Sequence, residues 1–76
     1  IDSMGWAYYK LGDYDTARSY LEQAYQLEPL PEIAAHYALA LWRAGDRALA
    51  QKVLQQTLQQ YPDDPILLRT QREIAR

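Results

Sequence analysis

Hydrophobic and polar positions follow the period of an α-helix along most of the chain. Bulky apolar side chains recur three or four residues apart, as at Met4, Tyr8 and Leu11, with polar or small residues between them. This spacing places the apolar side chains on one face of a helix. Strong helix formers dominate the composition, with 11 Ala, 11 Leu and 8 Gln. The pattern therefore predicts an all-α chain.

Glycine, aspartate and proline residues divide this pattern into segments. Gly12-Asp13 and Gly45-Asp46 can each end one helix and begin the next. Glycine tolerates a left-handed backbone, and an aspartate side chain accepts the free N–H groups of a helix start. Two further breaks contain prolines, at 29–31 and 61–65. The predicted helices span residues 2–11, 14–27, 32–44, 47–60 and 65–76.

Several residues return after 33 positions. The matching pairs are Gly5 and Ala38, Gly12 and Gly45, Asp13 and Asp46, Ala17 and Ala50, Leu21 and Leu54, and Pro29 and Pro62. Chance does not readily give this many coincidences at one period, which indicates a helix-turn-helix repeat. The chain then divides into repeat one at 1–30, repeat two at 31–63 and a final helix at 64–76. That helix is either a cap or part of a third repeat.

Residue size predicts how the helices pack. Gly5 stands within a predicted helix, where glycine costs about 1 kcal/mol relative to alanine. We therefore expect a neighbouring helix to cross closely there and at Ala38. Larger side chains are expected to fill the space between helices, and so are most tyrosines: Met4, Tyr8, Leu11, Tyr14, Tyr20, Leu21, Tyr25, Tyr37, Leu41, Leu54 and Leu58.

These residues resemble the tetratricopeptide repeat, whose pattern runs from an aromatic and Leu-Gly through Tyr, Gly-x-Tyr and two Ala to Pro. The first repeat matches through Met4-Gly5, Tyr8, Gly12-Asp13-Tyr14, Ala17, Leu21, Ala24 and Pro29, and the second through Tyr37-Ala38, Leu41, Gly45-Asp46, Ala50, Leu54, Thr57 and Pro62. The period of 33 departs from the family's usual 34. The resemblance implies a right-handed α-α superhelix of two helix-turn-helix repeats plus a C-terminal capping helix.

The resemblance also implies a protein-interaction module, adaptor or scaffold. Its concave groove, lined by the first helix of each repeat, would bind a partner protein or peptide. The partner-binding candidates are Trp6, Tyr9, Lys10, His36, Leu39, Trp42, Arg43, Arg69 and Arg72, with Asp2, Glu32, Ala35, Leu68 and Arg76 beside them. Aromatic side chains would anchor the partner, and the arginines would select acidic partners.

Alternatives remain for these residues. Trp6 and Trp42 are equally compatible with packing between helices, and the arginines of the last helix with a favourable interaction at its C-terminal dipole. Some tetratricopeptide domains clamp the C-terminal carboxylate of chaperones with Lys, Asn and Arg. The matching positions here hold Asp2, Trp6 and Leu39, and Arg69 alone keeps a clamp residue type, so we expect no such binding.

A structural role is the alternative function. Two repeats fall short of the roughly three that repeat proteins usually need for stability. The apolar ends of the stack, chiefly Ile1, Met4 and Tyr8, would then pack on further repeats of a longer protein or mediate self-association. Residues 2–14 and 31–36 are also similar to the C-terminal repeats of Gram-negative envelope proteins and lipoproteins. That likeness implies a bacterial source and favours the periplasm over the cytoplasm, with the compartment left open.

Composition argues against other classes. A net charge of −2 does not indicate a polybasic nucleic-acid binder, and 49% hydrophobic residues is too many for a disordered chain. No apolar run approaches the roughly 18 residues of a membrane span. The chain has no Cys, and its one His, His36, leaves no His pair for zinc. We expect His36 on a helix surface, and we expect no enzymatic activity, cofactor or metal.

Overall fold

The computed structural model describes residues 2–75, and of Asp2 only the backbone. The expectations for Ile1, Arg76 and the Asp2 side chain lie outside the described residues. Five helices form: α1 (Asp2–Lys10), α2 (Tyr14–Leu27), α3 (Pro31–Arg43), α4 (Arg47–Gln60) and α5 (Pro65–Ile74). The predicted all-α class is confirmed, and the predicted helix bounds differ from the observed ones by at most two residues.

The two Gly-Asp turns work as the sequence predicts. Gly12 and Gly45 have positive φ angles of 87° and 99°, which glycine adopts without a steric penalty. The Oδ1 atoms of Asp13 and Asp46 accept hydrogen bonds from the first turns of α2 and α4, each at 3.3 Å. Each turn therefore ends one helix and caps the next through local interactions.

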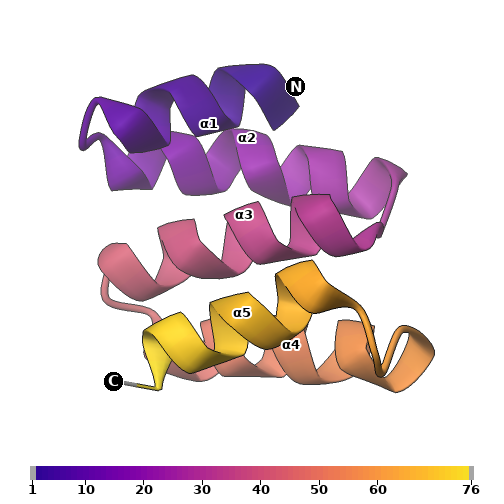
Figure 1. Cartoon of the computed structure of the whole chain (residues 1–76). Helices are drawn as coiled ribbons and strands as arrows, with labels where there is room; N and C mark the ends of the chain where they lie inside the picture. The colour runs from indigo at the N-terminus through magenta and orange to yellow at the C-terminus, as the bar shows by residue number, and fades with distance from the viewer. Residues whose placement is uncertain (1, 76) are drawn as a thin grey trace.

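The helices form two layers (Figure 1). Helices α1, α3 and α5 lie toward the viewer, and α2 and α4 lie behind them. Helix α3 packs mainly on α2 and α4 and touches α1 only lightly, whereas α5 packs mainly on α3 and less on α4. Helix α5 therefore packs more closely on α3, its neighbour in the same layer, than α3 packs on α1.

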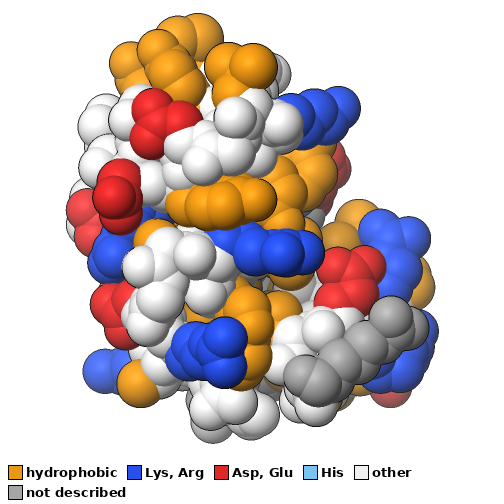
Figure 2. All heavy atoms as spheres, turned by 90° about the vertical axis from the view of Figure 1, so that its left-hand side faces the viewer, with side chains coloured by type: hydrophobic (Ala, Val, Ile, Leu, Met, Phe, Trp, Pro, Cys, Tyr) orange, Lys and Arg blue, Asp and Glu red, His pale blue; other side chains and the backbone are white. Residues whose placement is uncertain are grey.

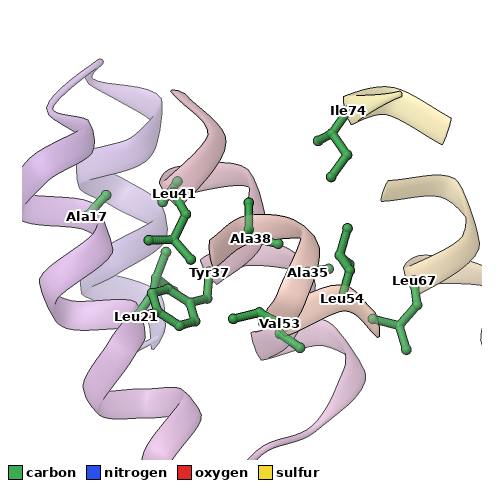
Figure 3. Close-up of a cluster of buried hydrophobic side chains, with 13 residues drawn as sticks. Ala17, Leu21, Ala35, Tyr37, Ala38, Leu41, Val53, Leu54, Leu67 and Ile74 are labelled. Atoms are coloured by element: carbon green, nitrogen blue, oxygen red, sulfur yellow. The ribbon is translucent and has the colours of Figure 1, made fainter. Parts of the chain in front are cut away.

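The core lies between the layers (Figure 3). Leu21, Leu41 and Leu67 are its largest fully buried side chains, and Tyr37 and Leu41 lie beside Ala17 and Leu21. In α5 the buried positions are Leu67, Thr70 and Ile74, which stand 33 residues after the buried Ala34, Tyr37 and Leu41 of α3. The repeat register therefore continues into α5.

Polar side chains tie repeat one to repeat two. Arg18 of α2 pairs with Asp46 at 3.2 Å, through the Oδ2 atom that the cap of α4 leaves free. The Tyr37 hydroxyl donates to Glu22 Oε2 at 3.3 Å. Thr57 donates its hydroxyl proton to the Val53 carbonyl at 2.9 Å, so Tyr25 is the donor in the 3.3 Å contact between the Tyr25 and Thr57 hydroxyls. These contacts orient α2 against both helices of the second repeat.

The first end of the stack departs from the expected packing. Met4 is 48% exposed and Leu11 is 79% exposed, so the expectation that they fill space between helices is wrong for the described chain. The residue of repeat two that corresponds to Met4 is Tyr37, which is buried against α2. No described helix stands in front of α1 to cover Met4 in the same way.

Gly5 lies where α1 and α2 cross. A Cβ atom at Gly5 would lie 2.6 Å from Leu21 Cγ and 3.3 Å from the Leu21 backbone nitrogen. We therefore expect Gly5→Ala to destabilise the fold by about 1–2 kcal/mol, the overpacking cost less the helix propensity gained. Urea unfolding followed by circular dichroism measures this change. Ser3→Ala, at an exposed site on the same helix, is the control and should leave stability unchanged; equal stability of both variants would contradict the close crossing.

Burial and the Glu22 carboxylate raise the pKa of Tyr37 to about 12. The unfolded chain loses this proton near the ordinary value of about 10. The stability that neutral Tyr37 contributes is therefore complete below pH 10 and is lost as the pH rises toward 12. Between pH 9 and 12 the wild type should lose roughly 2 kcal/mol more stability than Tyr37→Phe, measured by urea unfolding. The exposed Tyr61 supplies the control: Tyr61→Phe should follow the wild type.

Candidate functional site

Three adjoining hollows lie along the outer surface of α1, α3 and α5, which we call the concave face. The middle hollow, about 270 Å³, is lined by Trp6, Tyr9, Ala35, His36, Leu39, Ile66, Arg69, Thr70 and Glu73. The second, about 410 Å³, is lined by Leu39, Trp42, Arg43, Arg47, Glu73 and Ile74. The third, about 350 Å³, is lined by Ser3, Trp6, Ala7, Lys10, Glu32 and His36. Shared lining residues join the three into one trough.

Figure 2 shows this face at its right-hand side, where the outline is hollowed between the upper part and the lower right part. Basic, acidic and hydrophobic side chains meet around that hollow. The arrangement follows from the two-layer fold, because the first helices of successive repeats stand side by side and α5 leans onto α3.

A stack of aromatic rings forms the floor between two of the hollows. Trp6 stacks with His36 at a centroid distance of 3.9 Å and with Tyr9 at 4.6 Å, and Tyr14 meets Tyr9 edge-on at 5.3 Å. Trp6 and Tyr9 share a face of α1 because they are three residues apart, whereas the stack with His36 needs α3 beside α1. Trp6 therefore both packs between helices and lines the trough.

Trp42 and the nearby arginines form the other end of the trough. The guanidinium of Arg47 lies over the Trp42 ring, 4.7 Å from its centroid, as in a cation–π contact. A hydrogen bond with the Tyr9 hydroxyl, and then the charge effects of Tyr9 and Tyr14, raise the pKa of Arg43. Glu73 contributes in the same direction. Tyr9 thus links the aromatic stack, through its ring, to the basic end, through its hydroxyl.

The charge of the concave face differs from that of the whole chain. Its hollows are lined by four basic side chains, Lys10, Arg43, Arg47 and Arg69, and by two acidic ones, Glu32 and Glu73. The chain as a whole carries 8 basic and 10 acidic residues. The trough is therefore a basic, aromatic surface on an acidic molecule, suited to non-covalent recognition of an acidic partner. Among the described residues, no three His, Cys, Asp or Glu side chains gather closely enough to hold a metal ion.

The structure places most of the predicted site residues in the trough. Its lining includes Trp6, Tyr9, Lys10, His36, Leu39, Trp42, Arg43 and Arg69, as well as Glu32 and Ala35. Arg72 is exposed and Leu68 half-buried, and neither lines one of these three hollows. His36 is half-buried in a ring stack rather than on an open helix surface, because α1 lies over it.

Sequence reasoning missed Arg47 and Glu73. Arg47 begins α4, outside the helices that were expected to line the groove, and reaches it across the turn after Trp42. Glu73 stands four residues after Arg69, a spacing that puts both side chains on one face of α5. The spacing from Arg69 therefore indicates that Glu73 shares its face of α5. Nothing in the sequence indicates that Arg47 reaches the trough.

Comparison with known proteins identifies one family. A family model described as Tetratricopeptide repeat matches residues 3–65. The match covers α1 to α4 almost completely and reaches the first residue of α5. Searches of curated proteins and of solved structures gave no match.

Removing the His36 ring should disturb the aromatic stack. We expect His36→Ala to weaken the near-ultraviolet circular dichroism of the aromatic side chains and to reduce stability by about 0.5–1.5 kcal/mol, the usual value of a ring pair. Lys10→Ala, which removes an exposed side chain at the same trough, is the matched control and should change neither signal. An unchanged aromatic spectrum in His36→Ala would contradict the stack.

Proposed function

Because the chain belongs to the tetratricopeptide repeat family, we propose that it is a protein-interaction module whose concave face binds a segment of a partner protein. The observation that carries this proposal is the trough itself, with stacked aromatic rings at one end and a Trp–Arg contact at the other. Trp, Tyr and Arg are the side chains that contribute most often to binding energy in protein interfaces.

Pre-organisation supports a binding role for these rings. Trp6, Tyr9, His36 and Trp42 are half-buried and held by neighbouring side chains. A partner that covers their remaining exposed edges buries apolar surface without having to freeze mobile side chains, which lowers the entropic cost of association. Such a surface favours an extended or helical segment that runs across α1, α3 and α5.

Charge favours an acidic segment. Arg69 and Lys10 are exposed at the middle and third hollows, and Arg43 at the second. Guanidinium groups bind carboxylates through charge-assisted hydrogen bonds. We therefore propose a partner segment that alternates apolar or aromatic side chains with Asp or Glu. Trp6 and Leu39 stand where the chaperone-binding members of the family have clamp residues, so the proposal does not include a carboxylate-clamp chaperone ligand.

We further propose that the module acts without catalysis, cofactor or nucleic acid, as members of the family typically do. Within residues 2–75 no helix is both long enough and apolar enough to cross a membrane.

Self-association through the ends of the stack is the second candidate function. Met4 is 48% exposed at one end. At the other end a hollow of about 280 Å³ lies between α4 and α5, lined by Gln51, Leu54, Gln55, Gln71, Ile74 and Ala75. Stacking on further repeats would cover the exposed Met4 at one end and fill the hollow at the other. The concave face remains the better-supported site because it combines aromatic anchors with a charge opposite to that of the whole chain.

Panning a library of displayed random 12-residue peptides against the immobilised wild-type chain tests the proposal. We expect enrichment of acidic peptides that also contain aromatic or aliphatic residues. Arg69→Glu should weaken the best peptide by about fivefold or more, because it reverses a charge in the trough without removing packed atoms. Isothermal titration calorimetry at low ionic strength measures the change.

Lys52→Glu is the matched control, because Lys52 is an exposed base on α4 in the other layer. It should leave the affinity for the same peptide within about twofold. Equal losses in both variants would mean that net charge, rather than the trough, governs binding. Enrichment of peptides without acidic residues would contradict the proposed partner chemistry.

A further inference from the structure

The end of the molecule formed by α1 and α2 repeats a surface that is covered in repeat two. Met4, Tyr8 and Tyr20 stand 33 residues before Tyr37, Leu41 and Val53. Those three residues of repeat two are at most 4% exposed, whereas Met4 is 48% exposed and Tyr8 and Tyr20 are half-buried. We call Met4, Tyr8, Tyr20 and Asp13 the N-terminal face.

In repeat two the equivalent surface is covered by helix α2. Tyr37 and Leu41 lie beside Ala17 and Leu21 of α2 (Figure 3). Figure 2 shows hydrophobic side chains gathered at the top of the molecule, the end at which α1 and α2 lie in Figure 1. The internal repeat therefore supplies a template for what covers the N-terminal face: an α-helix packed as α2 packs on α3.

A polar contact makes the template more specific. Asp46 caps α4 through Oδ1 and binds Arg18 of α2 through Oδ2 at 3.2 Å. Asp13 caps α2 through Oδ1 in the same way, and within the described residues its Oδ2 atom receives no hydrogen bond or ion pair. Asp13 therefore offers a carboxylate oxygen where Asp46 binds a guanidinium.

We propose that the N-terminal face binds an amphipathic helix of a partner protein that carries the α2 pattern Ala-Arg-x-x-Leu. The alanine allows the close approach, the leucine packs on Met4 and Tyr8, and the arginine pairs with Asp13. A second copy of this chain does not fit the pattern, because its own Ala17 and Leu21 are completely buried. Helix α4 does not fit it either, since Gln51 replaces the arginine.

A synthetic helix tests this docking directly. The probe is a fluorescent peptide with the sequence of residues 13–28, held helical by a hydrocarbon staple between positions 19 and 23, which are exposed in α2. We expect saturable binding to the intact 76-residue chain by fluorescence anisotropy. Met4→Lys should weaken it by about tenfold or more, because a charged side chain replaces buried apolar surface. The probe carries four acidic residues and one basic residue, so Arg69→Glu on the concave face tests whether it binds the trough instead. Unchanged affinity supports the N-terminal face, and a loss as large as that of Met4→Lys would overturn the docking.

A double-mutant cycle identifies the ion pair. Asp13→Asn in the chain keeps a good helix cap but removes the charge. Asp13→Asn in the chain and Arg18→Gln in the peptide should each weaken binding by about two- to fivefold at low salt. When both changes are present, the loss should be little larger than that of either change alone. Additive losses would place the peptide arginine away from Asp13 and overturn the docking geometry.

Two other results would overturn the proposal. One is the absence of saturable binding by the stapled peptide, or binding that Met4→Lys does not weaken. The other is a wild-type dimer in sedimentation velocity that Met4→Lys dissociates, which would assign the face to a second copy of the chain. A concentration-independent monomer together with Met4-dependent peptide binding supports the partner helix.

Discussion

The close contact between Leu21 and Gly5 is the constraint on which the rest of the structure depends. Leu21 is completely buried, and its side chain occupies the space in which a Cβ of residue 5 would stand. This contact sets how closely α2 approaches α1. Tyr37 and Leu41 then pack beside Leu21, so one side chain helps to fix both the fold of repeat one and its junction with repeat two.

The polar contacts act on this junction in a different way. Hydrophobic burial is non-directional, so apolar packing alone tolerates some sliding of one helix along another. The Arg18–Asp46 pair and the Tyr37–Glu22 hydrogen bond join specific atoms of α2 to specific atoms of the second repeat. They help to set the axial position of α2 against the second repeat.

Comparison of the two repeats separates positions that maintain the fold from positions that line the trough. Positions 12, 13, 17 and 21 keep the same residues after 33 positions, and they supply turns, caps and core packing. The positions of Ser3, Trp6 and Tyr9 instead become His36, Leu39 and Trp42, and all six side chains line the trough. The fold can therefore stay constant from repeat to repeat while the chemistry of the concave face changes.

The sequence by itself determined the helices and their register. The turns depend on residues next to each other in the chain: Gly12 and Gly45 adopt positive φ, and Asp13 and Asp46 cap the helices that follow. The 33-residue period is visible in the order of the residues alone. The resemblance to the tetratricopeptide repeat, applied in this register, predicted most of the residues that line the trough. Tertiary structure alone decided the Trp6–His36 stack, the placement of Arg47 on Trp42 and the lean of α5 onto α3. It also decided that Met4 is exposed while its equivalent Tyr37 is buried. The reason is that these features depend on distances between helices and on which surfaces have a neighbour, and local sequence encodes neither.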